Sequence, residues 1–284
     1  TIVIKPAKDI IYFAYFAPYT LEQHYTLIAS SLNSEFCRHE VLGKTIEDRD
    51  IELVRFSSNP ESEGKKACWI IARQHPGESM SEWWMEGLIE QLVDGPKTFV
   101  KQLLKESDIY VIPNMNPDGS YRGNLRTNAA GRNLNREWEN PSLDKSPEVY
   151  FVERKMRETG VDFFLDVHGD ESLPYCFIAG TEGITAWDQK KQAQLDFFKD
   201  RLAQSNPDFQ TEVGYPAKGP GLANMTMSAT HTAATHNCLA MTLEMPFKDT
   251  IDTPDEEYGW SPIRSKQLAH SCLLVMAEYL RELC

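Results

Sequence analysis

The sequence has no apolar run long enough to cross a membrane, no excess of basic residues and no signal-peptide pattern near its start. Its 284 residues contain 29 Lys and Arg against 42 Asp and Glu, which gives a formal charge of −13. An acidic surface repels the phosphates of nucleic acid and of anionic membranes, so we expect neither as a main partner. These absences together favour a cytoplasmic protein.

The cysteines are also few and scattered, without a CxxC pair or the spacing of a disulfide-rich domain. They are Cys37, Cys68, Cys176, Cys238, Cys272 and Cys284. Three of them fall within apolar runs typical of buried strands, where a thiol behaves as a small apolar group. We therefore expect free thiols and a reducing compartment.

What the sequence does contain is an alternation of short apolar runs and helical stretches. Runs bounded by turn residues predict buried strands at 67–74, 108–115, 162–169 and 238–245. Apolar spacing predicts helices over 80–94, 97–106, 147–159, 185–204 and 262–282. Ser79 and Glu82 have the spacing of a capping box at the start of the first helix. The alternation predicts an α/β sandwich with a largely parallel sheet, formed as one domain by residues 1–284.

Three possible metal ligands follow the ends of predicted strands. His75 and Glu78 come after one strand, and His168 ends another. Functional sites of open α/β sheets gather at the carboxyl ends of strands, so these residues can meet. Two histidines and a glutamate form the ligand set of a hydrolytic zinc site that keeps one position open for water. Alone, the His-x-x-Glu pattern is equally typical of a solvated turn. The remaining histidines are interpreted as surface or core residues: His24, His39, His231, His236 and His270.

Four blocks carry a family resemblance. They are HPGESMSEWWMEG (75–87), IPNMNPDGSYRGNLRTNAAGRNLNREW (112–138), DVHGD (166–170) and TLEMPF (242–247). In this order they resemble the zinc carboxypeptidases of the carboxypeptidase A type, most closely the cytosolic carboxypeptidase subfamily. Residues 11–28 also resemble the start of that subfamily's catalytic domain. The resemblance implies a three-layer α/β/α sandwich with a mixed, largely parallel sheet. It also implies a small β-rich domain upstream, against which we expect residues 1–15 to pack.

The resemblance implies one zinc ion per chain, held by His75, Glu78 and His168. Glu244 resembles the general base, which takes a proton from the zinc-bound water and delivers it to the leaving amine. Arg126 resembles the arginine that stabilises the oxyanion of the transition state.

Three further residues match positions that bind substrate. Asn135 and Arg136 resemble the pair that grips the terminal carboxylate of the peptide. Tyr215, on a loop that aligns loosely, is the candidate for the tyrosine that closes over bound substrate. Two other arginines of the same loop, Arg122 and Arg132, are expected to pair with surface acids.

The chain departs from the subfamily at two places. Asn133 stands where the subfamily has an aspartate behind a zinc-ligating histidine, so that the hydrogen bond can persist without the charge. The segment 218–230 lacks the arginine that pairs with an acidic terminal side chain. We expect Lys218 to point to solvent, and a pocket for neutral or apolar side chains walled by Met225 or Met227.

The sequence therefore predicts a zinc metallocarboxypeptidase that removes residues from the C-termini of peptides or proteins. A zinc deacylase of N-acyl amino acids resembling aspartoacylase uses the same ligand set and is the main alternative. A peptide-binding homologue without catalysis is the other. The NPDG block and the arginine loop favour the peptidase. The oligomeric state is left open.

Overall fold

The structure is a computed structural model that describes residues 3–11, 13–59 and 64–282. The predicted free thiol of Cys284 and the opening Thr1–Ile2 lie outside this range. The five other cysteines are free and buried, as expected. Among the described residues, no helix is both long and apolar enough to span a membrane.

A seven-stranded sheet forms the middle of the molecule, in the order β1-β2-β4-β3-β5-β7-β6. Its strands are β1 (Cys37–Lys44), β2 (Asp50–Phe56), β3 (Lys66–Ala72), β4 (Ser107–Ile112), β5 (Phe163–Asp170), β6 (Phe177–Ala179) and β7 (Leu239–Pro246). The four central strands, β4, β3, β5 and β7, run parallel to one another. β1, β2 and β6 pair antiparallel at the edges. The predicted mixed, largely parallel sheet is confirmed.

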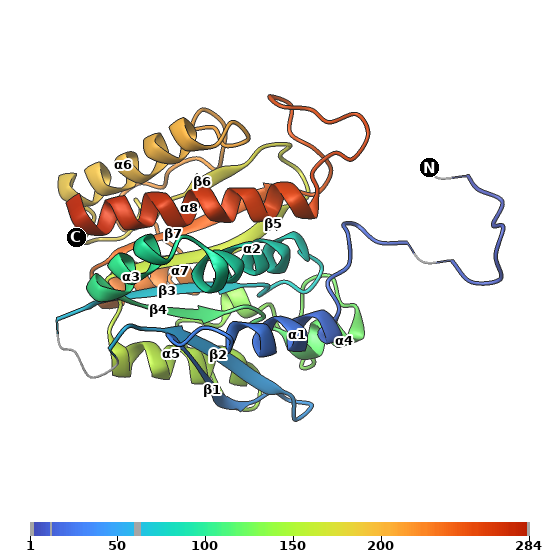
Figure 1. Ribbon diagram of the computed structural model, residues 1–284, viewed down its shortest axis with the longest axis horizontal. Helices are drawn as coiled ribbons and strands as arrows, with labels where there is room; N and C mark the ends of the chain where they lie inside the picture. Colours follow the sequence, from blue (N-terminus) through green and yellow to red (C-terminus); the bar gives the residue numbers. More distant parts are fainter. Residues whose placement is uncertain (1–2, 12, 60–63, 283–284) are drawn as a thin grey trace.

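Helices cover both faces of the sheet and complete the three layers (Figure 1). The first face packs against α1 (Leu21–Ser31), α2 (Met80–Asp94), α3 (Lys97–Glu106), α6 (Gln189–Ser205) and α8 (Pro262–Glu282). The second face packs against α5 (Pro147–Thr159) and α7 (Ser228–His236). Short α4 (Pro117–Arg122) and a 3₁₀ turn at Leu134–Arg136 lie in the loop after β4. The strands have apolar side chains on both faces, which is typical of a sheet buried between two helical layers.

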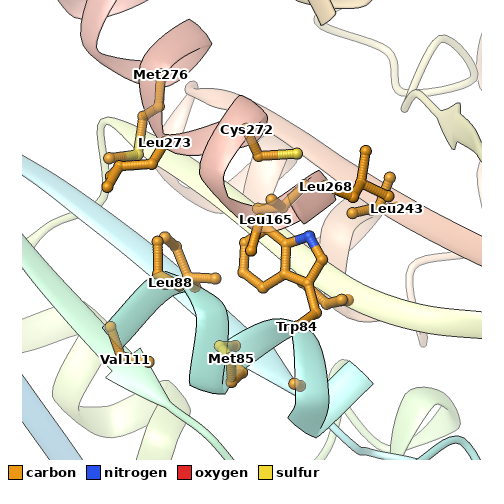
Figure 2. Packing of buried hydrophobic residues seen from close by; sticks show 14 of the residues in the cluster. Trp84, Met85, Leu88, Val111, Leu165, Leu243, Leu268, Cys272, Leu273 and Met276 are labelled. Atoms are coloured by element: carbon orange, nitrogen blue, oxygen red, sulfur yellow. The ribbon is translucent and has the colours of Figure 1, made fainter. Parts of the chain in front are cut away.

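The core between α2 and α8 fixes how these helices cross the sheet. Trp84 and Leu88 of α2 meet Leu268 and Cys272 of α8 over the central strands (Figure 2). All four side chains are fully or almost fully buried. Because α2 begins directly after the turn that carries His75, this packing also fixes the position of that turn.

The predicted helices and strands exist, but the capping box at Ser79 is wrong. Four of the five helices have the predicted bounds, whereas the ends of α6 and of the strands are shifted. The Ser79 hydroxyl donates to the carbonyl of Ala17 at 2.9 Å and makes no cap hydrogen bond. Glu82 instead receives hydrogen bonds from His24 and Arg73. Hydrogen bonds to residues distant in the sequence have therefore replaced the local hydrogen bonds of a capping box. The elements without a counterpart in the prediction are α1, α4, α7, β1, β2 and β6.

The described part of the N-terminal segment runs away from the domain (Figure 1). Its apolar side chains are exposed, among them Val3, Ile10 and Phe13. Tyr15 makes the first ring contact with the domain, edge-on to Phe247. The upstream domain expected from the resemblance stays a prediction.

Candidate active site

The predicted ligands and base meet at the carboxyl ends of three neighbouring strands. His75 lies three residues beyond β3, and His168 and Glu244 lie near the ends of β5 and β7. His168 and Glu244 are direct partners in the parallel pairing of these two strands. The topology therefore brings together residues that are up to 169 positions apart in the chain.

His75, Glu78 and His168 form a compact, buried triad. One ligand atom of each lies within 4.8 Å of the others. Glu78 stands between the two rings, with Oε1 2.6 Å from His75 Nδ1 and Oε2 2.7 Å from His168 Nδ1. The Nδ1 atoms of both rings therefore point to the same small region. Sequence spacing correctly predicted this convergence.

Each imidazole has a second polar partner behind it. His75 Nε2 lies 2.9 Å from Asn133 Oδ1, and His168 Nε2 lies 2.8 Å from Asp166 Oδ2. Both oxygens accept hydrogen bonds, so each Nε2 acts as the donor and leaves Nδ1 available to a metal. Asn133 thus keeps the expected hydrogen bond, while the carboxylate support lies behind the other histidine.

Asp166 contacts several polar side chains behind the site, and it was not predicted as a site residue. Its Oδ2 also accepts hydrogen bonds from Gln74 Nε2 at 2.6 Å and from the Ser228 hydroxyl. Trp138 Nε1 in turn donates to Gln74 Oε1 at 2.8 Å. The one signal in the sequence is a charged residue that directly follows three apolar residues of β5, two positions before His168 and so on the same face.

The charges around the triad favour a cation. Glu78, Asp166 and Glu244 are all buried, and none forms an ion pair with a described Lys or Arg. Burial raises the pKa of Glu244, and the nearby carboxylates of Glu78, Asp170 and Asp166 raise it further, against the effect of His168.

Burial and the neighbouring charged groups also shift the pKa values of His168 and Glu78. Burial alone would lower the pKa of His168, but Asp166 and Glu78 raise it well above its usual range. Burial alone would raise the pKa of Glu78, but His75 and His168 lower it. Two imidazoles and a carboxylate in an acidic, buried setting fit zinc.

A cleft of about 430 Å³ opens over the triad, and every predicted substrate residue lines it. Among the described ion pairs, Arg126 and Arg136 have no carboxylate partner, whereas Arg122 pairs with Glu47 and Arg132 pairs with Glu137. Burial and the charge of Arg126 lower the pKa of Arg136. Two guanidinium groups without paired acids make this part of the cleft suited to an anion.

The amide of Asn135 is oriented by the fold. Its Oδ1 accepts a hydrogen bond from the backbone N–H of Ser228 at 2.9 Å. The Nδ2 group is therefore left to donate within the cleft, beside Arg136. This arrangement suits the recognition of a carboxylate.

Tyr215 lies at the rim, on the exposed loop 213–224. Its hydroxyl donates to Asp170 and lies 3.4 Å from Glu244 Oε1. Burial raises the pKa of Tyr215, and the negative charge of Glu244 and the hydrogen bond to Asp170 raise it further. Met227 lines the cleft, but Met225 is not among the lining residues. Lys218 is exposed, as expected, and it also lines the cleft.

Comparisons with known proteins agree with this geometry. Residues 25–266 match the family model described as zinc carboxypeptidase. A metallo-carboxypeptidase from Pseudomonas aeruginosa, solved in complex with (2-guanidinoethylmercapto)succinic acid, is 45% identical with a TM-score of 0.91 over 95% of this chain and 71% of that chain. A metallo-carboxypeptidase from Burkholderia cenocepacia is 40% identical with a TM-score of 0.90 over 94% and 71%.

Relatives from animals are more distant and longer. Cytosolic carboxypeptidase 6 of Caenorhabditis elegans is 29% identical over 257 residues, which are 86% of this chain. The match covers 55% of that relative, so this chain spans about half of its length.

Proposed function

The chain belongs to the zinc carboxypeptidase family, whose members hydrolyse C-terminal peptide bonds, and we propose that its buried triad binds one zinc ion. The ligands are His75, Glu78 and His168. The observation that carries this assignment is the convergence of both Nδ1 atoms and the Glu78 carboxylate on one region, with each Nε2 held by an oxygen behind it. A bound zinc would polarise the scissile carbonyl and lower the pKa of a coordinated water.

Glu244 is the proposed general base. It lies beside His168 in the sheet, and its Oε2 is buried without a hydrogen-bond partner among the described residues. This carboxylate can accept a proton from the attacking water and return it to the leaving amine. Tyr215 is proposed to cover the bound substrate from the rim, where its hydroxyl is within reach of Glu244.

The substrate's free carboxylate is proposed to bind Arg136 and the Asn135 amide. Both line the cleft, and Arg136 is without a paired acid among the described residues. Arg126, on the same wall, is proposed to stabilise the oxyanion as the carbonyl becomes tetrahedral. The reaction then acts at the terminal bond because the carboxylate site lies next to the metal site.

The five buried cysteines of the described residues form no disulfide, which supports a cytoplasmic location, and we propose this location for the protein. A reducing compartment keeps thiols from pairing.

The test is turnover of three matched substrates by the zinc-loaded protein. A tripeptide with a free carboxylate should be cleaved, and the same peptide with a C-terminal amide should be a poor substrate because Arg136 loses its partner. Hydrolysis of an N-acyl amino acid in preference to the tripeptide would support the deacylase alternative instead. Absence of turnover on all three, with zinc bound, would support a binding protein.

A further inference from the structure

The residue that leads into the metal-ligand turn has an unusual backbone. Arg73 follows β3 and precedes the turn 74–78, and its φ of 59° lies in the left-handed region. Residues other than glycine rarely adopt this conformation, because the Cβ approaches the backbone closely. Such a residue keeps a left-handed geometry only where its surroundings hold it there.

The Arg73 side chain folds back over the turn that it precedes. Its Nε donates to the carbonyl of Pro76 at 3.1 Å, and its Nη1 donates to the carbonyl of Tyr19 at 2.8 Å and to Glu82. The residue is only 5% exposed. One guanidinium therefore contacts the Pro76 carbonyl, the Tyr19 carbonyl before α1 and the Glu82 side chain in the first turn of α2. The segment 73–76 that it spans contains His75.

Glu82, the acidic partner, is fully buried and belongs to a wider charge network. It also accepts hydrogen bonds from His24 Nδ1 at 2.6 Å and Asn114 Nδ2 at 3.1 Å. His24 Nε2 lies 2.8 Å from Glu52 of β2. A protonated His24 and Arg73 balance the two carboxylates. A buried carboxylate without a positively charged partner costs free energy of folding. The charges of Glu82 and Glu52 are therefore both compensated only when Arg73 is in place.

We propose that Arg73 and Glu82 are positioning residues for the metal site, an inference that rests on the proposed zinc-binding function. The buried network holds Arg73 in its left-handed conformation, and this conformation directs the turn that presents His75 and Glu78 to the metal. Without the guanidinium, the strained backbone loses the hydrogen bonds to Pro76, Tyr19 and Glu82 that compensate it. The turn relaxes, and the two ligands that follow within five residues lose their alignment.

A merely structural role for Arg73 would give a different result, and the chain offers a matched control. The Arg264 side chain of α8 is 12% exposed, and it donates to Asp208, Asp249 and the Thr253 carbonyl. It does not line the cleft. Replacing Arg264 by alanine removes more hydrogen bonds than replacing Arg73, but only Arg73 is connected to the ligand turn.

The experiment measures the zinc dissociation constant by competition with a chromogenic chelator, together with the Tm of the zinc-free protein. Both Arg73→Ala and Arg264→Ala should lower Tm. Arg73→Ala should also weaken zinc binding about tenfold or more, as expected when a support behind a ligand is lost. Arg264→Ala should keep the parent's zinc affinity within about twofold. Equal zinc affinity in the two variants would overturn the proposal.

Two additional variants cover the remaining outcomes. If Arg73→Ala does not fold, Arg73→Lys can still reach Glu82 with its ammonium but lacks the fork for Pro76 and Tyr19. It should bind zinc several-fold more weakly than the parent, and a parent-like affinity would again overturn the inference. His168→Ala should abolish zinc binding. If it does not, the proposed zinc site itself is wrong, whereas loss in His168→Ala without loss in the Arg73 variants rejects the positioning role alone.

Discussion

The two walls of the cleft are built differently. On the metal wall, His75, Glu78 and His168 are buried, and each histidine is held from behind by a second polar group. On the opposite wall, the loop 213–224 carries Tyr215, which is 47% exposed, and Leu222, which is 70% exposed. The reaction centre is therefore fixed by the core, whereas the part of the cleft that meets variable side chains is attached loosely.

The two walls differ because the backbone of one is hydrogen-bonded within the central sheet and a helix, whereas the backbone of the other makes few hydrogen bonds. The metal wall extends from strands of the central sheet and from the tightly packed start of α2 (Figure 2). The loop joins the rest of the protein through isolated contacts, such as the Ala223 N–H to the Gly183 carbonyl at 3.2 Å. Loops on a rigid scaffold can change with little cost to stability. We expect mutations on the metal wall to affect catalysis and stability strongly, and mutations on the loop to affect selectivity.

The largest effect is expected for Glu244→Gln. The amide keeps the shape of the side chain but cannot accept the proton of the attacking water. Turnover should fall by about a hundred- to ten-thousandfold, the usual contribution of a general base. Measured kcat, with zinc content and KM as controls, checks this. A variant with near-parental kcat would remove Glu244 from the mechanism.

The next effect concerns His24, in the network beneath the metal wall. Burial alone would lower its pKa, but the charge of Glu82 and the hydrogen bonds to Glu52 and Glu82 raise it to about 9. Because the folded-state pKa lies above the ordinary value of 6.5, the protonated form stabilises the fold fully below about pH 6.5. This contribution, roughly 3 kcal/mol at about 1.4 kcal/mol per pKa unit, is lost as the pH rises through 9.

Denaturant unfolding of zinc-free protein between pH 6 and 10 measures the effect, with His24→Gln as the comparison. The parent should lose free energy of unfolding across this range, and the variant should show a flatter profile because its amide does not titrate. The other groups near His24 are Glu82 and Glu52, with Arg73 and His39 beyond these carboxylates. They are present in both proteins, so parallel pH profiles would contradict the assignment.

The same contrast explains what the sequence could predict. His75, Glu78 and His168 were predictable because each stands close to the end of a recognisable strand, and strand ends of a parallel sheet meet. Arg122 and Arg132 were correctly expected to pair with acids, since surface arginines in an acidic protein find carboxylates readily. In these cases a local pattern contained enough information.

Apart from Asn133, which the family resemblance placed behind a ligand, the residues that support the site were not predictable in this way. Asp166 and Ser228 are 62 positions apart, and His24 and Glu82 are 58 apart, so no local pattern joins them. Glu82 was misleading, because its spacing from Ser79 fits a capping box that tertiary contacts override. The wall carrying 213–224 was harder to predict for the opposite reason, because few contacts constrain it.

A smaller effect, on zinc affinity, is expected from changing the residues that hydrogen-bond to Nε2 of the two ligand histidines. Asp166→Asn removes the charge behind His168, which should weaken zinc binding by about ten- to a hundredfold. Asn133→Asp adds a charge behind His75 and should strengthen zinc binding by less than that, because its hydrogen bond already exists. Chelator competition measures both. An Asp166→Asn variant that binds zinc like the parent would show that the hydrogen bond alone is sufficient.

The smallest effect is expected on the loosely attached wall, in the choice of terminal residue. Beyond Arg136 the cleft is lined by Ala223, Asn224, Met227 and Thr230, and Lys218 is the one basic side chain among the described lining residues besides Arg126 and Arg136. Lys218 is exposed, so its ammonium can remain hydrated, and an acidic substrate side chain gains little from it. Peptides ending in Leu or Phe should therefore be preferred over those ending in Glu by about tenfold in kcat/KM, the scale of one apolar group in a pocket.

A panel of peptides differing only in the last residue tests this, with Lys218→Met as the sharper comparison. That variant should leave the order of preference unchanged. If the parent prefers Glu and Lys218→Met abolishes the preference, then the flexible wall supplies the missing cation, and the loop rather than the core sets the specificity for charge.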